Sequence, residues 1–182
     1  MNISVFCASS DSVKEEYRIQ AKQLGNWIAQ NGHTLVYGGA TGGLMQAVAL
    51  GASELEGDIL GVIPDTIIER GRTSDLPTQL FKVESMSERK AMMTEYSDLF
   101  VVLPGGFGTL DEFFDVTSAC MVNEHDKPTI LYNPDNYWEG LIMQIERMKK
   151  DNLAYNVSNA ARLKIVNSID EIFSMIETIE NK

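Results

Sequence analysis

Short apolar runs alternate with longer amphipathic segments along the whole chain. Five runs are rich in the branched and large apolar side chains that strands favour, at residues 3–7, 34–37, 59–63, 99–103 and 129–132. The first four are almost continuously apolar, which is typical of strands covered on both faces in a parallel sheet. The pattern therefore predicts an α/β fold with an open, doubly wound, mainly parallel sheet and helices on both faces.

The periodicity between these runs predicts the helices. The first extends from about Ser12, where Ser12 and Glu15 fit a capping box, to about Asn31. A closing helix over residues 168–179 follows from isoleucines and a phenylalanine at helical spacing. Residues 65–80 are expected to form an irregular loop after a strand, where ligands often bind. Four more helices are expected to begin near Gly43, Ser85, Thr109 and Asn136.

The composition limits the domain number and the classes of protein to which this chain can belong. A chain of 182 residues with 44% apolar side chains predicts one domain, residues 1–182, around one core. A formal charge of −11 without clusters of Lys and Arg argues against a nucleic-acid groove. Two distant cysteines and the lack of a leader-like start predict a cytoplasmic protein. No apolar run reaches the roughly 20 residues that a membrane helix needs, so no membrane partner is expected.

Two glycine-rich turns, at residues 37–43 and 103–109, follow predicted strands. Glycines let backbone amides approach a phosphate, and a helix that starts at such a turn adds unpaired amides with a positive dipole end. Together the turns predict an anion cradle at the carboxyl edge of the sheet, although either alone also fits a simple strand-to-helix turn. Neither turn is a P-loop, and no dinucleotide fingerprint follows the first strand, so NAD is not expected.

Glu112 has two interpretations. Thr109 and Glu112 have the spacing of a capping box, with Thr109 as N-cap and Glu112 at the third helical position. A carboxylate there would also point back into the mouth of the glycine-rich turn, where it could act as a base. The spacing alone favours the cap.

Arg89 and Lys90 stand in the first turn of the helix expected from Ser85. Two cations there oppose the helix dipole, and a bound anion would resolve the conflict. The alternative is that both are solvated or paired with Glu84 or Glu88.

Other catalytic chemistries find little support in the sequence. The two histidines, His33 and His125, lack the spacing of metal ligands, so no metal site is expected. Cys7 is expected to be a buried residue of the first strand rather than a reactive thiolate. The Gly-x-Ser-x-Gly elbow of serine hydrolases is missing.

Two motifs together resemble the LOG family, long mislabelled as lysine decarboxylases. They are Ser-Met-Ser-Glu-Arg-Lys at residues 85–90 and Pro-Gly-Gly-Phe-Gly-Thr-Leu-Asp-Glu at residues 104–112. Shorter matches at residues 5–10, 36–39, 43–45, 61–64 and 125–128 extend the resemblance over nearly the whole chain. It implies a Rossmann-like homodimer that hydrolyses cytokinin riboside 5′-monophosphates, and often AMP, to free base and ribose 5-phosphate. No cofactor or metal is implied.

The resemblance also implies roles for single residues. Arg89 and Glu112 match the catalytic pair of the family. The implied phosphate- and substrate-binding residues are Lys90, Gly105, Gly106, Gly108, Thr109, Gly39 and Met86. The chain departs from the family pattern at Ala40 and Gln46, where glycines are usual, and at Gly71, where a glutamate is frequent.

Two rival functions stay open at this point. A decarboxylase that uses pyridoxal phosphate would need a Schiff-base lysine, and no lysine stands out above Lys90. A nucleotide-binding module without catalysis would use the same loops. The apolar side chains near the two motifs fit either a dimer surface or ordinary core; they are Met86, Met92, Met93, Phe113, Phe114 and Met121.

Overall fold

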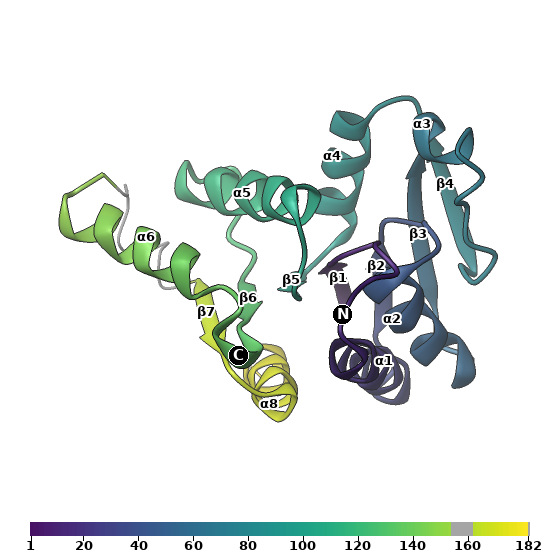
Figure 1. Ribbon diagram of the computed structural model, residues 1–182, viewed down its shortest axis with the longest axis horizontal. Coiled ribbons are helices and arrows are strands. Elements are labelled where there is room, and N and C mark those ends of the chain that lie inside the picture. The colour runs from purple at the N-terminus through teal and green to yellow at the C-terminus, as the bar shows by residue number, and fades with distance from the viewer. Residues whose placement is uncertain (154–161, 182) are drawn as a thin grey trace.

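The computed structural model describes residues 1–153 and 162–181. Its centre is a seven-stranded, all-parallel sheet in the order β4-β3-β2-β1-β5-β6-β7 (Figure 1). The strands are β1 (Asn2–Phe6), β2 (Thr34–Tyr37), β3 (Ile59–Pro64), β4 (Gln79–Val83), β5 (Leu99–Val102), β6 (Thr129–Tyr132) and β7 (Leu163–Val166). The predicted doubly wound α/β fold and its five strands are confirmed.

Helices cover both faces of the sheet (Figure 1). On one face, α1 (Glu15–Gln30), α2 (Gly43–Glu54) and α8 (Ile169–Glu180) pack over one apolar cluster. On the other, α4 (Met86–Tyr96), α5 (Phe107–Met121) and α6 (Glu139–Lys150) pack over a second cluster. The short helix α3 (Asp65–Ile68) follows β3, and the 3-10 turn η1 (Pro134–Asn136) precedes α6.

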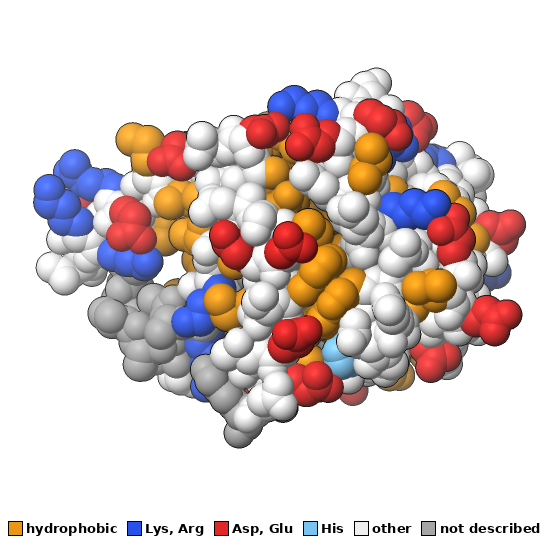
Figure 2. Space-filling model, turned by 90° about the horizontal axis from the view of Figure 1, so that it is seen from below, with side chains coloured by type: hydrophobic (Ala, Val, Ile, Leu, Met, Phe, Trp, Pro, Cys, Tyr) orange, Lys and Arg blue, Asp and Glu red, His pale blue; other side chains and the backbone are white. Residues whose placement is uncertain are grey.

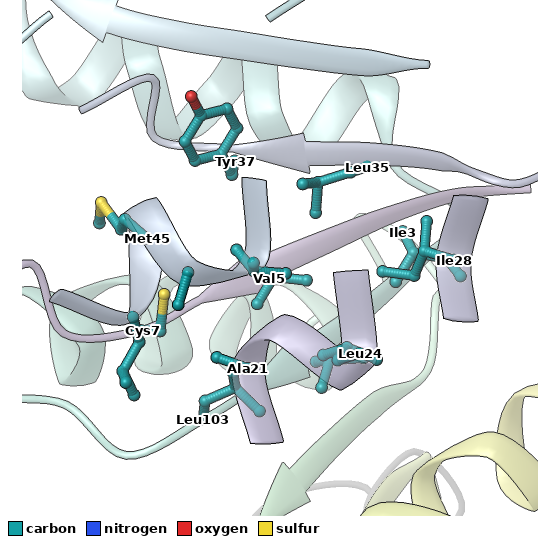
Figure 3. Packing of buried hydrophobic residues seen from close by; sticks show 14 of the residues in the cluster. Ile3, Val5, Cys7, Ala21, Leu24, Ile28, Leu35, Tyr37, Met45 and Leu103 are labelled. Carbon is teal, nitrogen blue, oxygen red and sulfur yellow. The ribbon is translucent and has the colours of Figure 1, made fainter. Parts of the chain in front are cut away.

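The core follows directly from the apolar runs. Val5 of β1 and Leu24 of α1 are fully buried, and Figure 3 shows side chains from β1, β2 and α1 meeting in one cluster. Burial of each such side chain contributes about 1.5–3 kcal/mol. Where α1 and α8 meet, Trp27 and Phe173 stack with ring centroids 5.0 Å apart.

Figure 2 shows an apolar stripe on the face seen from below, with acidic side chains beside it.

Strand order places a switch point between β1 and β5. The chain moves outward from β1 to β4 and then returns to pair β5 with the other side of β1. The loops after these two strands therefore diverge to opposite faces, which leaves a crevice at their carboxyl ends. Within the described residues, no helix is long and apolar enough to span a membrane.

Several helix starts differ from the prediction. The capping box at Ser12 is wrong: α1 begins at Glu15 after Lys14, and no side chain caps it. Helix α6 begins three residues later than expected, after η1. The start near Ser85 is confirmed, because the Ser85 hydroxyl accepts a hydrogen bond from the Glu88 amide at 3.1 Å. The closing helix is also confirmed as α8, with two isoleucines fully buried.

The segment expected to be an irregular loop, residues 65–80, in fact contains α3 and the first residues of β4. Strands β4 and β7 had no counterpart in the prediction. Both lie at the edges of the sheet, and most of their side chains are only half-buried or exposed. An edge strand therefore carries polar residues that interrupt the apolar run by which a buried strand is found.

Candidate active site

A cavity of about 350 Å³ lies at the carboxyl ends of β1 and β2, beside the first turns of α4 and α5. This is the switch point, where open α/β sheets bind their ligands. Five segments contribute to its lining, which comprises Cys7, Ala8, Ser9, Ser10, Gly38, Ala40, Met45, Ile67, Met86, Arg89, Gly106, Gly108, Thr109 and Glu112. The motifs at residues 85–90 and 104–112 thus meet in one cavity.

Arg89 projects from the first turns of α4 into the interior and is only 4% exposed. Its Nε donates a hydrogen bond to the Val62 carbonyl at 3.2 Å, and its Nη1 donates to Oε1 of Glu112 at 2.5 Å. The alternative that Arg89 is solvated or paired with Glu84 or Glu88 is therefore wrong. Two hydrogen bonds from one planar group fix the orientation of the guanidinium.

Glu112 is as buried as its partner, at 3% exposed. Oε1 accepts the hydrogen bond from Arg89, whereas buried Oε2 has no partner among the described residues. A buried carboxylate oxygen without a partner is costly, so structures keep one where a ligand or a reaction uses it. Because the residue lines the cavity, this oxygen is the candidate for contact with a bound molecule.

The capping box proposed for Thr109 and Glu112 is wrong. Helix α5 begins at Phe107 with Gly106 as N-cap, so Thr109 lies inside the first turn and Glu112 lies beyond it. The Thr109 side chain packs against Gly105, where an added Cβ would lie 2.0 Å from the threonine hydroxyl oxygen. Glu112 is consequently free of a capping role and faces Arg89.

Burial dominates the electrostatics of the site. It raises the pKa of Glu112, and the positive charge of Arg89 opposes that rise. Burial, reinforced by the charge of Glu112, also raises the pKa of the Cys7 thiol. Cys7 directly follows β1 instead of lying within it, and it is 2% exposed, so its expected burial is confirmed. The carboxylate is the group in this cavity whose basicity is shifted towards neutral pH.

The two glycine-rich turns differ in what their amides bind. At the start of α2, the Gly43 amide donates to Oδ1 of Asp11 at 3.0 Å, and the Leu44 amide donates to the Ala8 carbonyl at 2.8 Å. These two amides are therefore used inside the protein, whereas Gly38 and Ala40 of the first turn line the cavity, and the two-turn cradle stays a prediction. At the start of α5 no side chain among residues 1–153 and 162–181 caps the helix, and Gly106, Gly108 and Thr109 line the cavity. The free amides and positive dipole end of α5 can hold an anion.

Three of the predicted binding residues lie outside the cavity lining. Lys90 forms ion pairs with Asp111 at 2.9 Å and Asp115 at 3.0 Å. Gly105 packs behind Thr109, and Gly39 packs against the side chains of β3 and β4. The predicted Met86, by contrast, lines the cavity and is 40% exposed.

The loop after β1 belongs to the site although it was not predicted to, because Ala8, Ser9 and Ser10 line the cavity. Their place directly after the first strand of a doubly wound sheet could have indicated it. Met45 and Ile67 were also missed, because a single apolar residue at a helix start gives no chemical signal.

The lining does not fit pyridoxal phosphate. That cofactor is bound through a Schiff base to a lysine. None of the described residues that line the cavity is a lysine, and nearby Lys90 is paired with two aspartates. Within residues 1–153 and 162–181 there is also no group of three or more side chains placed to hold a metal ion.

Comparison with known proteins places the chain in a family. The family model described as "Possible lysine decarboxylase" matches residues 45–179. Cytokinin riboside 5′-monophosphate phosphoribohydrolase LOG3 of Arabidopsis thaliana is 36% identical over 166 residues, which are 91% of this chain and 76% of the plant protein. The chain belongs to the LOG family.

Other relatives agree with this assignment. One is LOGL5 of Oryza sativa, a probable cytokinin riboside 5′-monophosphate phosphoribohydrolase. It is 37% identical over 164 residues, which are 90% of the present chain and 65% of the rice protein. Among solved structures, the molybdenum cofactor binding protein of Rippkaea orientalis superposes with a TM-score of 0.74 at 24% identity, covering 98% of this chain and 96% of the other. At that identity the likeness shows a shared Rossmann-like fold.

Proposed function

We propose that this LOG family protein hydrolyses the N-glycosidic bond of a purine nucleoside 5′-monophosphate, releasing the free base and ribose 5-phosphate. The observation that carries the proposal is Oε2 of Glu112, which is buried, without a partner among the described residues, and next to the open start of α5. The names of the relatives specify the same chemistry on cytokinin riboside 5′-monophosphates. AMP, which has the same phosphate and ribose, is the second expected substrate.

The phosphate is assigned to the start of α5. Uncapped amides at a helix start bind anions through hydrogen bonds and the helix dipole. Gly106 and Gly108 contribute no side chains that would keep a phosphate away from the backbone. This binding places the ribose over Glu112, about one helical turn further along α5. The base then lies towards the apolar part of the lining, which includes Met45 and Ile67.

Glu112 and Arg89 divide the chemistry of the bond cleavage. As the C1′–N9 bond of the purine nucleotide breaks, its electron pair leaves with the base and positive charge builds on the ribose. The Glu112 carboxylate stabilises that charge and accepts a proton from the water whose oxygen bonds to C1′. The proton that the departing base requires comes from solvent or from protonated Glu112. Arg89 holds the carboxylate in one orientation throughout.

The deciding experiment measures adenine and ribose 5-phosphate release from AMP and from isopentenyladenosine 5′-monophosphate. We expect release by the wild type and a loss of about 10²–10⁴-fold in Glu112→Gln, which keeps the shape but removes the base. Arg89→Ala is expected to lose turnover to a similar extent. A folded wild type that binds AMP but releases neither product would instead support the nucleotide-binding module.

We also propose that the protein forms a homodimer through the surface of α5. Phe114 and Val122 are 42% and 65% exposed, and a groove of about 310 Å³ lies between α5 and α6. Met93 and Phe113, which the sequence also offered as partner surface, are buried in the core. Light scattering is expected to give about twice the 20.2 kDa of one chain, and a 20 kDa particle at micromolar concentration would contradict the dimer.

A further inference from the structure

The first glycine-rich turn, residues 37–43, makes room for two arginine side chains. A Cβ at Gly38 would lie 2.0 Å from Nη2 of Arg89, and a Cβ at Gly42 would lie 2.4 Å from Nη2 of Arg72. The amides of Gly43 and Leu44 already have partners inside the protein. Gly38 and Gly42 therefore serve to admit the two guanidinium groups. Arg89 has a part in the proposed reaction, whereas Arg72 has none so far.

Arg72 joins three loops that are far apart in the sequence. It lies between α3 and β4, and its Nη2 donates hydrogen bonds to the Ser9 carbonyl at 2.6 Å and the Thr41 carbonyl at 2.7 Å. The backbone adds a return contact, because the Thr41 amide donates to the Arg72 carbonyl at 2.8 Å. One side chain therefore ties the loops after β1 and β2 to the segment after α3.

The loops that Arg72 ties form one wall of the cavity. Residues 8–10 and Ala40 line it on this side, and Arg89 and Glu112 line it from α4 and α5. The catalytic pair is held separately, by the Val62 carbonyl and by the direct contact between the two side chains. Loss of Arg72 would thus loosen the wall without releasing the pair.

We propose that Arg72 is a positioning residue that fixes the wall of residues 8–10 and Ala40 and so sets the affinity for the nucleotide. The functional half of this inference rests on the proposed function, because it assumes that the cavity binds a nucleoside monophosphate. A guanidinium suits the task, since its planar group presents several donors in a fixed geometry. Lysine at this position keeps the charge but not that geometry.

The kinetic test compares Arg72→Ala, Arg72→Lys and Arg70→Ala with the wild type, using AMP as substrate. Arg70 is a matched control: it carries the same charge two residues away, is exposed, and forms no side-chain hydrogen bond or ion pair with a described residue. We expect Arg72→Ala to raise KM about tenfold or more with kcat within about threefold, as when ground-state binding is lost. Arg72→Lys should recover part of the loss, and Arg70→Ala should match the wild type.

Hydrogen exchange tests the structural half independently of activity. In Arg72→Ala, peptides covering residues 8–11 and 39–43 should exchange about tenfold faster, with β5 and α5 unchanged. An unchanged KM or unchanged exchange in Arg72→Ala would overturn the inference. An equal rise of KM in Arg70→Ala would also overturn it, because charge alone would then explain the effect. A wild type inert on both nucleotides would sink the proposed function, while the exchange arm would still decide whether Arg72 holds the wall.

Discussion

Gly38 lies so close to the guanidinium of Arg89 that position 38 has no room for a side chain. A Cβ at position 38 would lie 2.0 Å from Nη2 and 3.0 Å from Cζ of the guanidinium. Both atoms belong to the group that binds Glu112, so the arginine could not stay in place beside a larger residue. The glycine at the end of β2 is thus part of the site although it has no chemical group to offer.

Gly38→Ala should therefore inactivate the enzyme without unfolding it. The displaced guanidinium would lose its hydrogen bond to Glu112, and a displacement of about 1 Å at a catalytic group can cost about 10²-fold in rate. Turnover of AMP is the measurement. Gly140→Ala in α6 is the control, because no atom of the described residues lies within 4 Å of its added Cβ and activity should not change. Turnover near the wild-type level in Gly38→Ala would contradict the assigned geometry.

The pH profile of the reaction should reflect the buried carboxylate. Burial raises the pKa of Glu112, so the ionised form needed for catalysis is lost at a higher pH than for an exposed glutamate. The acid limb of kcat/KM for AMP should accordingly lie above pH 4.5, the ordinary glutamate value. Because the charge of Asp111 contributes to the rise, Asp111→Asn should move the limb to lower pH. A limb at or below pH 4.5 would count against Glu112 as the base.

Much of this molecule could be predicted from the sequence, and the exceptions have physical causes. Strands β1, β2, β3, β5 and β6 are buried, so their apolar runs are visible, whereas β4 and β7 are half-exposed edges. The family resemblance implied that Arg89 and Glu112 form a pair, whereas spacing alone favoured a cap for Glu112, because its role depends on where α5 begins. Helix α5 begins at Phe107, and its N-cap is Gly106 in an extended conformation, whereas the predicted N-cap was Thr109. The hydrogen bonds of Arg72 go to carbonyls, which carry no sequence signal.

Stability should fall on mild acidification because of His33. Burial is the main reason that its pKa is lowered, with the N-terminal ammonium acting in the same direction and Glu180 against it. The unfolded chain then binds a proton more readily than the folded protein, so stability is lost as pH falls through the ordinary histidine range. In His33→Gln, the free energy of unfolding measured in urea should differ less between pH 5 and pH 7.5 than it does in the wild type. The pKa of His125 is lowered too, so the free energy of unfolding should depend even less on pH in a variant that also carries His125→Gln. An unchanged difference in both variants would refute this account.

Two neighbouring phenylalanines on α5 should separate core stability from association. Phe113 is 1% exposed and Phe114 is 42% exposed, with their ring centroids 5.1 Å apart. Phe113→Ala leaves a cavity and should lower the free energy of unfolding by about 3–5 kcal/mol. Phe114→Ala should leave unfolding of the single chain within about 1 kcal/mol but weaken a dimer formed on this surface. Urea unfolding and light scattering at several protein concentrations measure the two effects. A Phe114→Ala protein that remains a dimer at nanomolar concentration would place the interface elsewhere.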